Sequence, residues 1–239
     1  MDLGGRTALV TGGARRIGRA ICLALAKEGV RVAIHCRSSE AEARDLAERC
    51  PGSVVLRADL ADAAERARLV PAAVDRLGGL DFLVNNASIY EKAPLAEIDE
   101  PLWEHALAVN LTAPFFLARD AGLHMRAKGS GAIVNVTDWA TDRPYPDRLP
   151  YFAAKAGLEA ATRGLARALA PEVRVNAVAP GPILLPEGAP GDLARAVLRV
   201  TPLGRLGGPE AVAKAVLFLL VHDFVTGETV RVDGGRSLK

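Results

Sequence analysis

The sequence predicts one doubly wound α/β domain of the Rossmann type over residues 1–239, with a seven-stranded parallel sheet and helices on both faces. Short apolar runs alternate with longer helical patterns from one end of the chain to the other, which is the arrangement of repeated βα units. Several of the short runs are almost wholly apolar, as strands buried on both faces should be. Half of the 239 residues are hydrophobic, enough for a substantial core.

The elements follow in order along the chain. We predict strands at residues 7–11, 30–35, 53–57, 80–85, 131–136, 174–178 and 229–232. We predict helices between them at residues 16–28, 40–49, 61–77, 102–128, 151–170 and 210–221. The stretch 180–191 is irregular, with four prolines and three glycines. It follows a strand end, so we expect a substrate loop over about 180–208; the alternative is a passive surface excursion.

Composition excludes several classes of protein. Lysine and arginine number 30 against 28 acidic residues, and their dispersal gives no reason to expect a nucleic-acid or membrane partner. The cysteines, Cys22, Cys36 and Cys50, lack metal or redox spacing, and the four histidines lack ligand spacing, so no metal is expected. No segment reads as a signal peptide or a membrane span. We therefore expect a cytoplasmic protein.

The first predicted strand leads into the turn TGGARRIG at residues 11–18, and a helix follows. Glycines permit a tight turn, and the backbone amides at a helix start attract a pyrophosphate. This position after the first strand favours a dinucleotide site over an ordinary turn. We expect cofactor contacts from Gly12, Arg16, Ile17 and Gly18.

The end of the second predicted strand indicates which dinucleotide binds. An acidic residue there would accept hydrogen bonds from the ribose hydroxyls of NAD, but HCRSS at residues 35–39 holds no acid. Arg37 with Ser38 or Ser39 suits a 2′-phosphate, so NADPH is favoured; the alternative is that Arg37 is a solvated surface charge. Asp59, followed by Leu60, lies where the adenine binds, although it is equally placed to cap the next helix.

Tyr151 and Lys155 are four residues apart in a predicted helix and so share one face. A nearby ammonium favours the phenolate, so we expect Lys155 to lower the pKa of Tyr151. A tyrosine tuned in this way can pass a proton as hydride moves.

These motifs, taken in order, resemble the short-chain dehydrogenase/reductase family over essentially the whole chain. The matching pieces are the 11–18 turn, NNA at 85–87, Asn110, Tyr151 with Lys155, PG at 180–181 and VDGG at 232–235. The resemblance implies that Tyr151 is the acid/base and that Lys155 holds the nicotinamide ribose. It implies that Asn110 keeps a kinked helix open for a proton relay and that Asn86 fixes the cofactor and the central strands. Further cofactor contacts implied in this way are Ala87, Pro180, Gly181 and Ile183.

One position departs from the family pattern. Asp138 stands where the family has a serine, thirteen residues before Tyr151. An ionised carboxylate only accepts hydrogen bonds, so it suits a ring that bears N–H groups, and once protonated it can deliver a proton to a ring nitrogen. The alternative is that Thr137 replaces the serine hydroxyl.

Asp138 makes the chain similar to the pteridine reductase branch of the family, including dihydromonapterin reductases. Further similarities are Arg16, where most relatives have glycine, and Ser88 after the NNA motif. The resemblance implies that Arg16, Ser88, Asp138 and Tyr151 contact a pterin or folate substrate. Tyr90 or Trp139 would add an aromatic wall, unless each only packs in the core.

We therefore expect NADPH-dependent hydride transfer to a C=N bond of a dihydropterin of the dihydromonapterin, dihydrobiopterin or dihydrofolate type. One alternative is a carbonyl or 3-oxoacyl-thioester reductase of the same family. Another is a noncatalytic nucleotide-binding protein. Relatives usually form homotetramers, so the resemblance implies that assembly here.

Overall fold

A computed structural model describes residues 3–186, 188 and 190–239, and it contains the predicted sheet. Seven strands pair in the order β3-β2-β1-β4-β5-β6-β7, and every neighbouring pair is parallel. The strands are β1 Thr7–Val10, β2 Arg31–Cys36, β3 Val54–Arg57, β4 Phe82–Asn85, β5 Gly131–Val136, β6 Val173–Pro180 and β7 Thr229–Val232. The Rossmann-type prediction is confirmed, and the chain order reverses between β1 and β4, where such sheets bind ligands.

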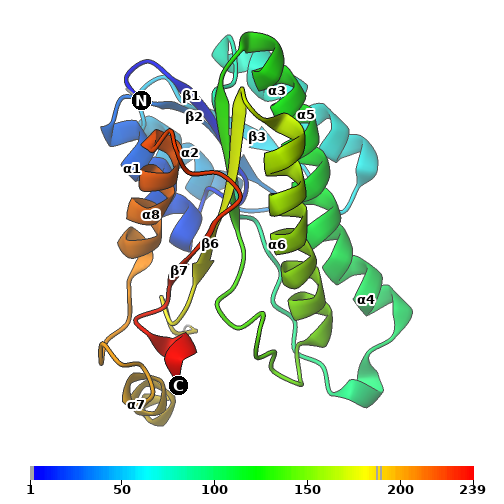
Figure 1. Cartoon of the computed structure of the whole chain (residues 1–239), viewed down its shortest axis with the longest axis vertical. Helices are drawn as coiled ribbons and strands as arrows, with labels where there is room; N and C mark the ends of the chain where they lie inside the picture. The colour runs from blue at the N-terminus through cyan, green and yellow to red at the C-terminus, as the bar shows by residue number, and fades with distance from the viewer. Residues whose placement is uncertain (1–2, 187, 189) are drawn as a thin grey trace.

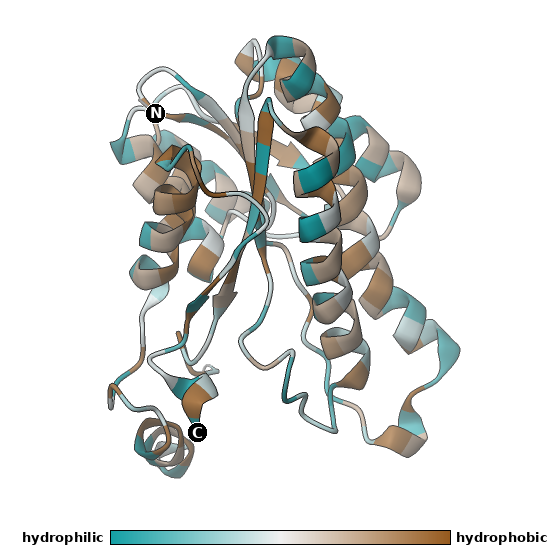
Figure 2. Cartoon of the chain, in the orientation of Figure 1, coloured by the Kyte–Doolittle hydropathy of each residue, from teal (hydrophilic) through white to brown (hydrophobic). Residues whose placement is uncertain are grey.

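Helices cover both faces of the sheet (Figure 1). Helices α1 (Arg16–Lys27), α2 (Glu40–Glu48) and α8 (Pro209–Val221) share one core cluster with the strands. Helices α3 (Ala63–Leu77), α5 (Ala113–Lys128) and α6 (Leu149–Leu169) share the other. Figure 2 shows hydrophobic residues along the strands and inner helix faces, with hydrophilic residues on the outer faces. Burial of these apolar faces is the main force that fixes the layers.

The single helix predicted over 102–128 is interrupted. The chain forms α4 (Glu100–Leu107), a π-helical turn (Ala108–Thr112) and then α5. Pro114 has no N–H to donate to the carbonyl of Asn110, four residues earlier, so the regular bond cannot form there. The π-helical turn contains Asn110, the residue at which the family resemblance implies a kinked helix. Turns of this kind are frequent at functional sites.

The predicted irregular region is also partly helical. Residues Gly191–Arg199 form α7, which the sequence analysis did not predict. None of its residues is buried, and the helix stands away from the sheet at the lower left of Figure 1. The helix is short, and the prolines and glycines that precede it predict an irregular segment rather than a helix. Two 3₁₀ turns, Leu95–Glu97 and Arg236–Leu238, complete the elements.

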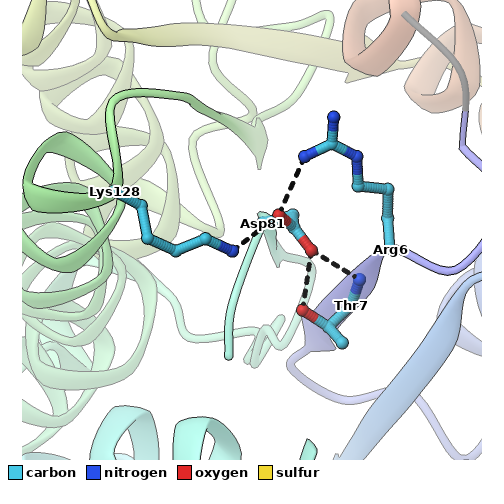
Figure 3. Close-up of polar contacts among 4 residues, drawn as sticks. All are labelled: Arg6, Thr7, Asp81 and Lys128. Carbon is cyan, nitrogen blue, oxygen red and sulfur yellow. Dashed lines mark hydrogen bonds and ion pairs between the residues drawn. The ribbon is translucent and has the colours of Figure 1, made fainter. Parts of the chain in front are cut away.

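A buried carboxylate fastens the end of the sheet opposite the expected site (Figure 3). Asp81, just before β4, accepts bonds at 2.9 Å from both the amide and the hydroxyl of Thr7. Its other oxygen accepts from Arg6 at 3.1 Å and from Lys128 of α5 at 2.8 Å. Burial alone would raise the pKa of Asp81, but these partners outweigh it and lower the pKa to about 2. The starts of β1 and β4 and the end of α5 are thereby joined.

We predict that Asp81→Asn lowers the free energy of unfolding at pH 7 by about 1–2 kcal/mol, less than the full pKa shift because solvent screens the two cations. Since the folded pKa lies below the usual 3.8, the stabilisation is complete above that value and is lost as pH falls toward 2. Urea unfolding should therefore show a difference between parent and variant that shrinks in acid. Asp75→Asn, at an exposed acid, is the control; an equal loss there would contradict the assignment.

Candidate active site

The carboxyl ends of the central strands surround a cleft of about 370 Å³. Its lining includes most of the predicted cofactor residues: Gly12, Arg16, Ile17, Gly18, Arg37, Ser38, Asp59, Leu60, Asn86 and Ala87. It also includes Ser88, which was predicted to contact the substrate. Five of the predicted cofactor residues do not line it: Tyr151, Lys155, Pro180, Gly181 and Ile183. Pro180 and Gly181 lie at the end of β6, where the Gly181 amide donates to Val232, and Ile183 lines a separate cavity of about 330 Å³.

The turn after β1 admits only glycine at two points. Gly12 has a φ of +61°, and a Cβ there would lie 2.9 Å from the Cα of Ala87. A Cβ on Gly18 would lie 2.1 Å from the carbonyl oxygen of Gly12. Helix α1 begins within the same turn and has no side-chain cap, so its first amides are left unpaired at the cleft, beside two glycines. These features fit a dinucleotide pyrophosphate.

Arg16 carries backbone strain. It is the one residue other than glycine with positive φ, at +50°, in the described ranges. The left-handed region costs an L-residue about 1–2 kcal/mol, a cost that glycine would not carry. The arginine side chain lines the cleft. A strained residue kept at a binding cleft indicates that its side chain is needed there.

Asn86 joins the two strands at the reversal of strand order. Its side-chain amide donates to the carbonyls of Thr11 at 2.9 Å and Gly12 at 3.1 Å. The Thr11 hydroxyl in turn accepts from the amides of Asn86 at 2.9 Å and Ala87 at 3.0 Å. The ends of β1 and β4 are therefore held in a fixed relation beneath the cleft.

Two residues that the sequence did not mark as part of the site support the adenosine end of the cleft. Arg57, the last residue of β3, donates from Nε to the carbonyl of Arg37 at 3.2 Å and so supports the predicted 2′-phosphate loop. His35 is buried, accepts the Gly12 amide at Nδ1 (3.1 Å) and contacts the Ala58 carbonyl through Nε2 (3.0 Å). Accepting at Nδ1 requires the neutral Nε2–H tautomer, and burial lowers the pKa of His35. No sequence motif marks either residue.

Asn110 fixes the segment between the cleft and the catalytic pair. It is fully buried, and its side-chain oxygen accepts from the Ser88 hydroxyl at 2.8 Å and the Ile89 amide at 3.1 Å. Its Nδ2 donates to the Ile89 carbonyl at 3.1 Å. The side chain is thus occupied in shaping the site wall, and a link from Asn110 to Lys155 would need a water.

A second cluster lies outside the lining of the cleft and consists of Asp138, Tyr151 and Lys155. The Tyr151 hydroxyl donates to Asp138 Oδ2 at 2.9 Å, and the Ala140 amide donates to Oδ1 at 2.8 Å. Lys155 is buried and donates to the Val136 carbonyl at 2.7 Å. Its ammonium lies 5.7 Å from the centre of the Tyr151 ring.

Asp138, and not Thr137, occupies the position facing the tyrosine. The hydroxyl of Thr137 is buried and donates to the Val178 carbonyl of β6 at 3.3 Å. Adjacent residues at a strand end point to opposite sides, so only one of the two can face Tyr151. The geometry therefore disfavours Thr137 as a substitute for the serine.

The pKa of Tyr151 corrects one expectation. Burial, followed by the charge of Asp138, raises this pKa well above its usual value, whereas Lys155 was expected to lower it. Lys155 is itself affected by burial, which lowers its pKa to about 8. Burial also raises the pKa of Asp138, against the bonds from Ala140 and Tyr151 and the charge of Lys155. In the protein alone, the tyrosine therefore holds its proton in a bond to an aspartate of weakened acidity.

Within the described ranges, no helix has both the length and the apolar character needed to cross a membrane. Across the same residues, no group of three or more His, Cys, Asp or Glu side chains is placed to hold a metal ion.

Comparison with known proteins identifies the family. Residues 12–237 match a family model described as enoyl-(acyl carrier protein) reductase. The chain is 39% identical to the granaticin polyketide synthase putative ketoacyl reductase 2 of Streptomyces violaceoruber, over 97% of this chain and 96% of that protein. It is 35% identical to the 3-oxoacyl-[acyl-carrier-protein] reductase FabG of Staphylococcus aureus, over 96% and 97%.

A crystal structure provides the third comparison. FolM alternative dihydrofolate reductase 1 from Brucella canis, complexed with NADP, superposes with a TM-score of 0.93 at 37% identity, over 100% of this chain and 96% of that one. The chain belongs to the short-chain dehydrogenase/reductase family and is an oxidoreductase of that family.

We predict that Arg16→Gly raises the free energy of unfolding by up to about 1 kcal/mol, because it removes the left-handed strain, less the entropy that glycine adds to the unfolded chain. The same change should weaken NADPH binding, because it removes a cation from the cleft. Urea unfolding and fluorescence titration measure the two effects. Arg15→Gly, at an unstrained φ of −136°, should destabilise the protein; a loss of stability in Arg16→Gly would contradict the prediction.

Proposed function

We propose that the chain is an NADPH-dependent reductase that adds hydride to a C=N bond of a dihydropterin. The observation that carries the proposal is the bond from the Tyr151 hydroxyl to the carboxylate of Asp138, at the position where the family has serine. A buried carboxylate is a poor partner for the oxygen of a ketone, since both are acceptors. It is a good partner for the N–H groups of a pterin ring, and the similarity to an alternative dihydrofolate reductase supports the same substrate class.

The choice of NADPH rests on the cleft. Arg37 and Ser38 line its adenosine end, no acid precedes them on β2, and Arg57 supports the loop. A guanidinium and a hydroxyl can both donate hydrogen bonds to the 2′-phosphate of NADPH. The ribose hydroxyls of NAD would instead need an acidic residue that accepts their hydrogen bonds. The Brucella protein was crystallised with NADP, which agrees with this choice.

The chain's own residues manage the proton. When bound, NADPH supplies the hydride that reaches the carbon of the C=N bond. The ring nitrogen then needs one proton, and the Asp138–Tyr151 pair holds a proton next to a carboxyl group whose pKa is raised. Delivery from this pair, with replacement from solvent, balances the reduction to the tetrahydro form. Lys155 would position the nicotinamide ribose with its buried ammonium.

The second candidate is a 3-oxoacyl-thioester reductase. The names of the relatives from Streptomyces violaceoruber and Staphylococcus aureus favour it. In that case Tyr151 would protonate a carbonyl oxygen, with Asp138 acting only to orient the tyrosine. Turnover of acetoacetyl thioesters, and none of dihydropterins, would establish this function instead.

Assembly is proposed on the family resemblance. We infer a cytoplasmic homotetramer, and exposed apolar side chains on α4 and α5 support contact between copies: Trp103, Phe115 and Leu123. Sedimentation of the purified protein as a monomer would contradict this inference.

The test of function is loss of NADPH absorbance with 7,8-dihydrobiopterin or 7,8-dihydrofolate. We expect turnover by the parent and a loss of at least about 100-fold in Asp138→Ser, the usual scale for removal of a proton-transfer group. Asp142→Ser, at an acid paired with Arg231 on the surface, is the matched control and should retain activity. A parent that turns over neither pterin would refute the proposal.

A further inference from the structure

Two arginines lie against aromatic rings beside the candidate catalytic pair. The guanidinium carbon of Arg148 lies 3.9 Å from the centre of the Tyr90 ring. The guanidinium carbon of Arg236 lies 5.5 Å from the centre of the Trp139 ring. Aromatic faces hold a guanidinium in a fixed plane and leave its N–H edge free for an anion.

Both pairs are connected to the reacting tyrosine. Tyr90 packs edge-on against Tyr151, with ring centres 4.6 Å apart. Trp139 follows Asp138 directly and contacts Tyr145, which contacts Phe152, the neighbour of Tyr151. The rings therefore form one continuous cluster around the site. Tyr90 is 48% exposed, so part of the cluster faces solvent and is open to a substrate.

Among the residues that the structure describes, the two guanidinium groups have no carboxylate partner. Within the described part of the chain, neither Arg148 nor Arg236 takes part in an ion pair. One nitrogen of Arg148 donates to the Tyr90 carbonyl at 3.1 Å, which holds the side chain and leaves its other N–H groups free. By contrast, Arg231 nearby is neutralised by Asp142. The aromatic cluster therefore carries two positive charges that no carboxylate of the described residues neutralises.

We propose that Arg148 and Arg236, stacked on Tyr90 and Trp139, form a subsite for the carboxylates of a substrate tail. The inference rests on the proposed function and deepens it, because it selects the folate class of dihydropterin over forms with a neutral tail. The exposed rings of the cluster, Tyr90 and Tyr145, offer contact surface for the aromatic linker of such a substrate. The arginines offer charge-assisted hydrogen bonds to its terminal carboxylates.

The test compares two substrates with the same reacting ring. For NADPH oxidation, kcat/KM is measured with 7,8-dihydrofolate, which carries carboxylates, and with 7,8-dihydrobiopterin, which does not. We expect Arg148→Gln and Arg236→Gln each to reduce the ratio of these two constants about tenfold, mainly through the KM for dihydrofolate. Added salt should lower the same ratio in the parent.

Controls separate the subsite from general damage. Arg231→Gln removes one positive charge from the same region and should leave the ratio unchanged. Arg148→Lys keeps the charge and should restore part of the ratio lost in Arg148→Gln. An equal fall for both substrates, or an unchanged ratio, would overturn the subsite while the pterin reductase function stands. Absence of turnover on both substrates would refute the proposed function itself.

Discussion

The site depends on the joint between β1 and β4. The side chain of Asn86 and the hydroxyl of Thr11 exchange hydrogen bonds with each other's backbone at the point where the strand order reverses. Beyond this joint the chain connections run to opposite faces of the sheet, to α1 on one face and to α5 on the other. The phosphate turn follows one strand, and the Ser88 segment that leads to Asn110 follows the other. Their relative position, and hence that of cofactor and substrate, is set there.

Burial is the second constraint, because it controls the acid–base chemistry. It raises the pKa values of Asp138 and Tyr151 and lowers that of Lys155, so each charged form is disfavoured before any ligand arrives. A bound dinucleotide and substrate change the charge and hydration around all three groups. In the proposed reaction, the proton held between aspartate and tyrosine would reach a substrate nitrogen without first being drawn from solvent.

Much of this arrangement could be predicted from the sequence. Local patterns located all seven strands, and the thirteen-residue spacing to Tyr151 pointed to Asp138. The π-helical turn was not predictable from periodicity, because it depends on a proline and on tertiary bonds from Asn110. Helix α7 was missed because its preceding prolines and glycines dominate the local composition. The roles of His35 and Arg57 depend on contacts between separate strands, and the raised pKa of Tyr151 depends on burial, so neither follows from residue spacing.

The imidazole of His35 has a consequence for attempts to change the cofactor. The ring bonds to the Gly12 amide on one side and to the Ala58 carbonyl on the other. The distance between the 11–18 turn and the end of β3 is therefore set by one imidazole ring. A redesign that shifts the adenosine loop toward NADH would transmit its displacement through this ring into the phosphate turn. We therefore expect a change of cofactor selectivity at the adenosine end to alter the affinity for the dinucleotide as a whole.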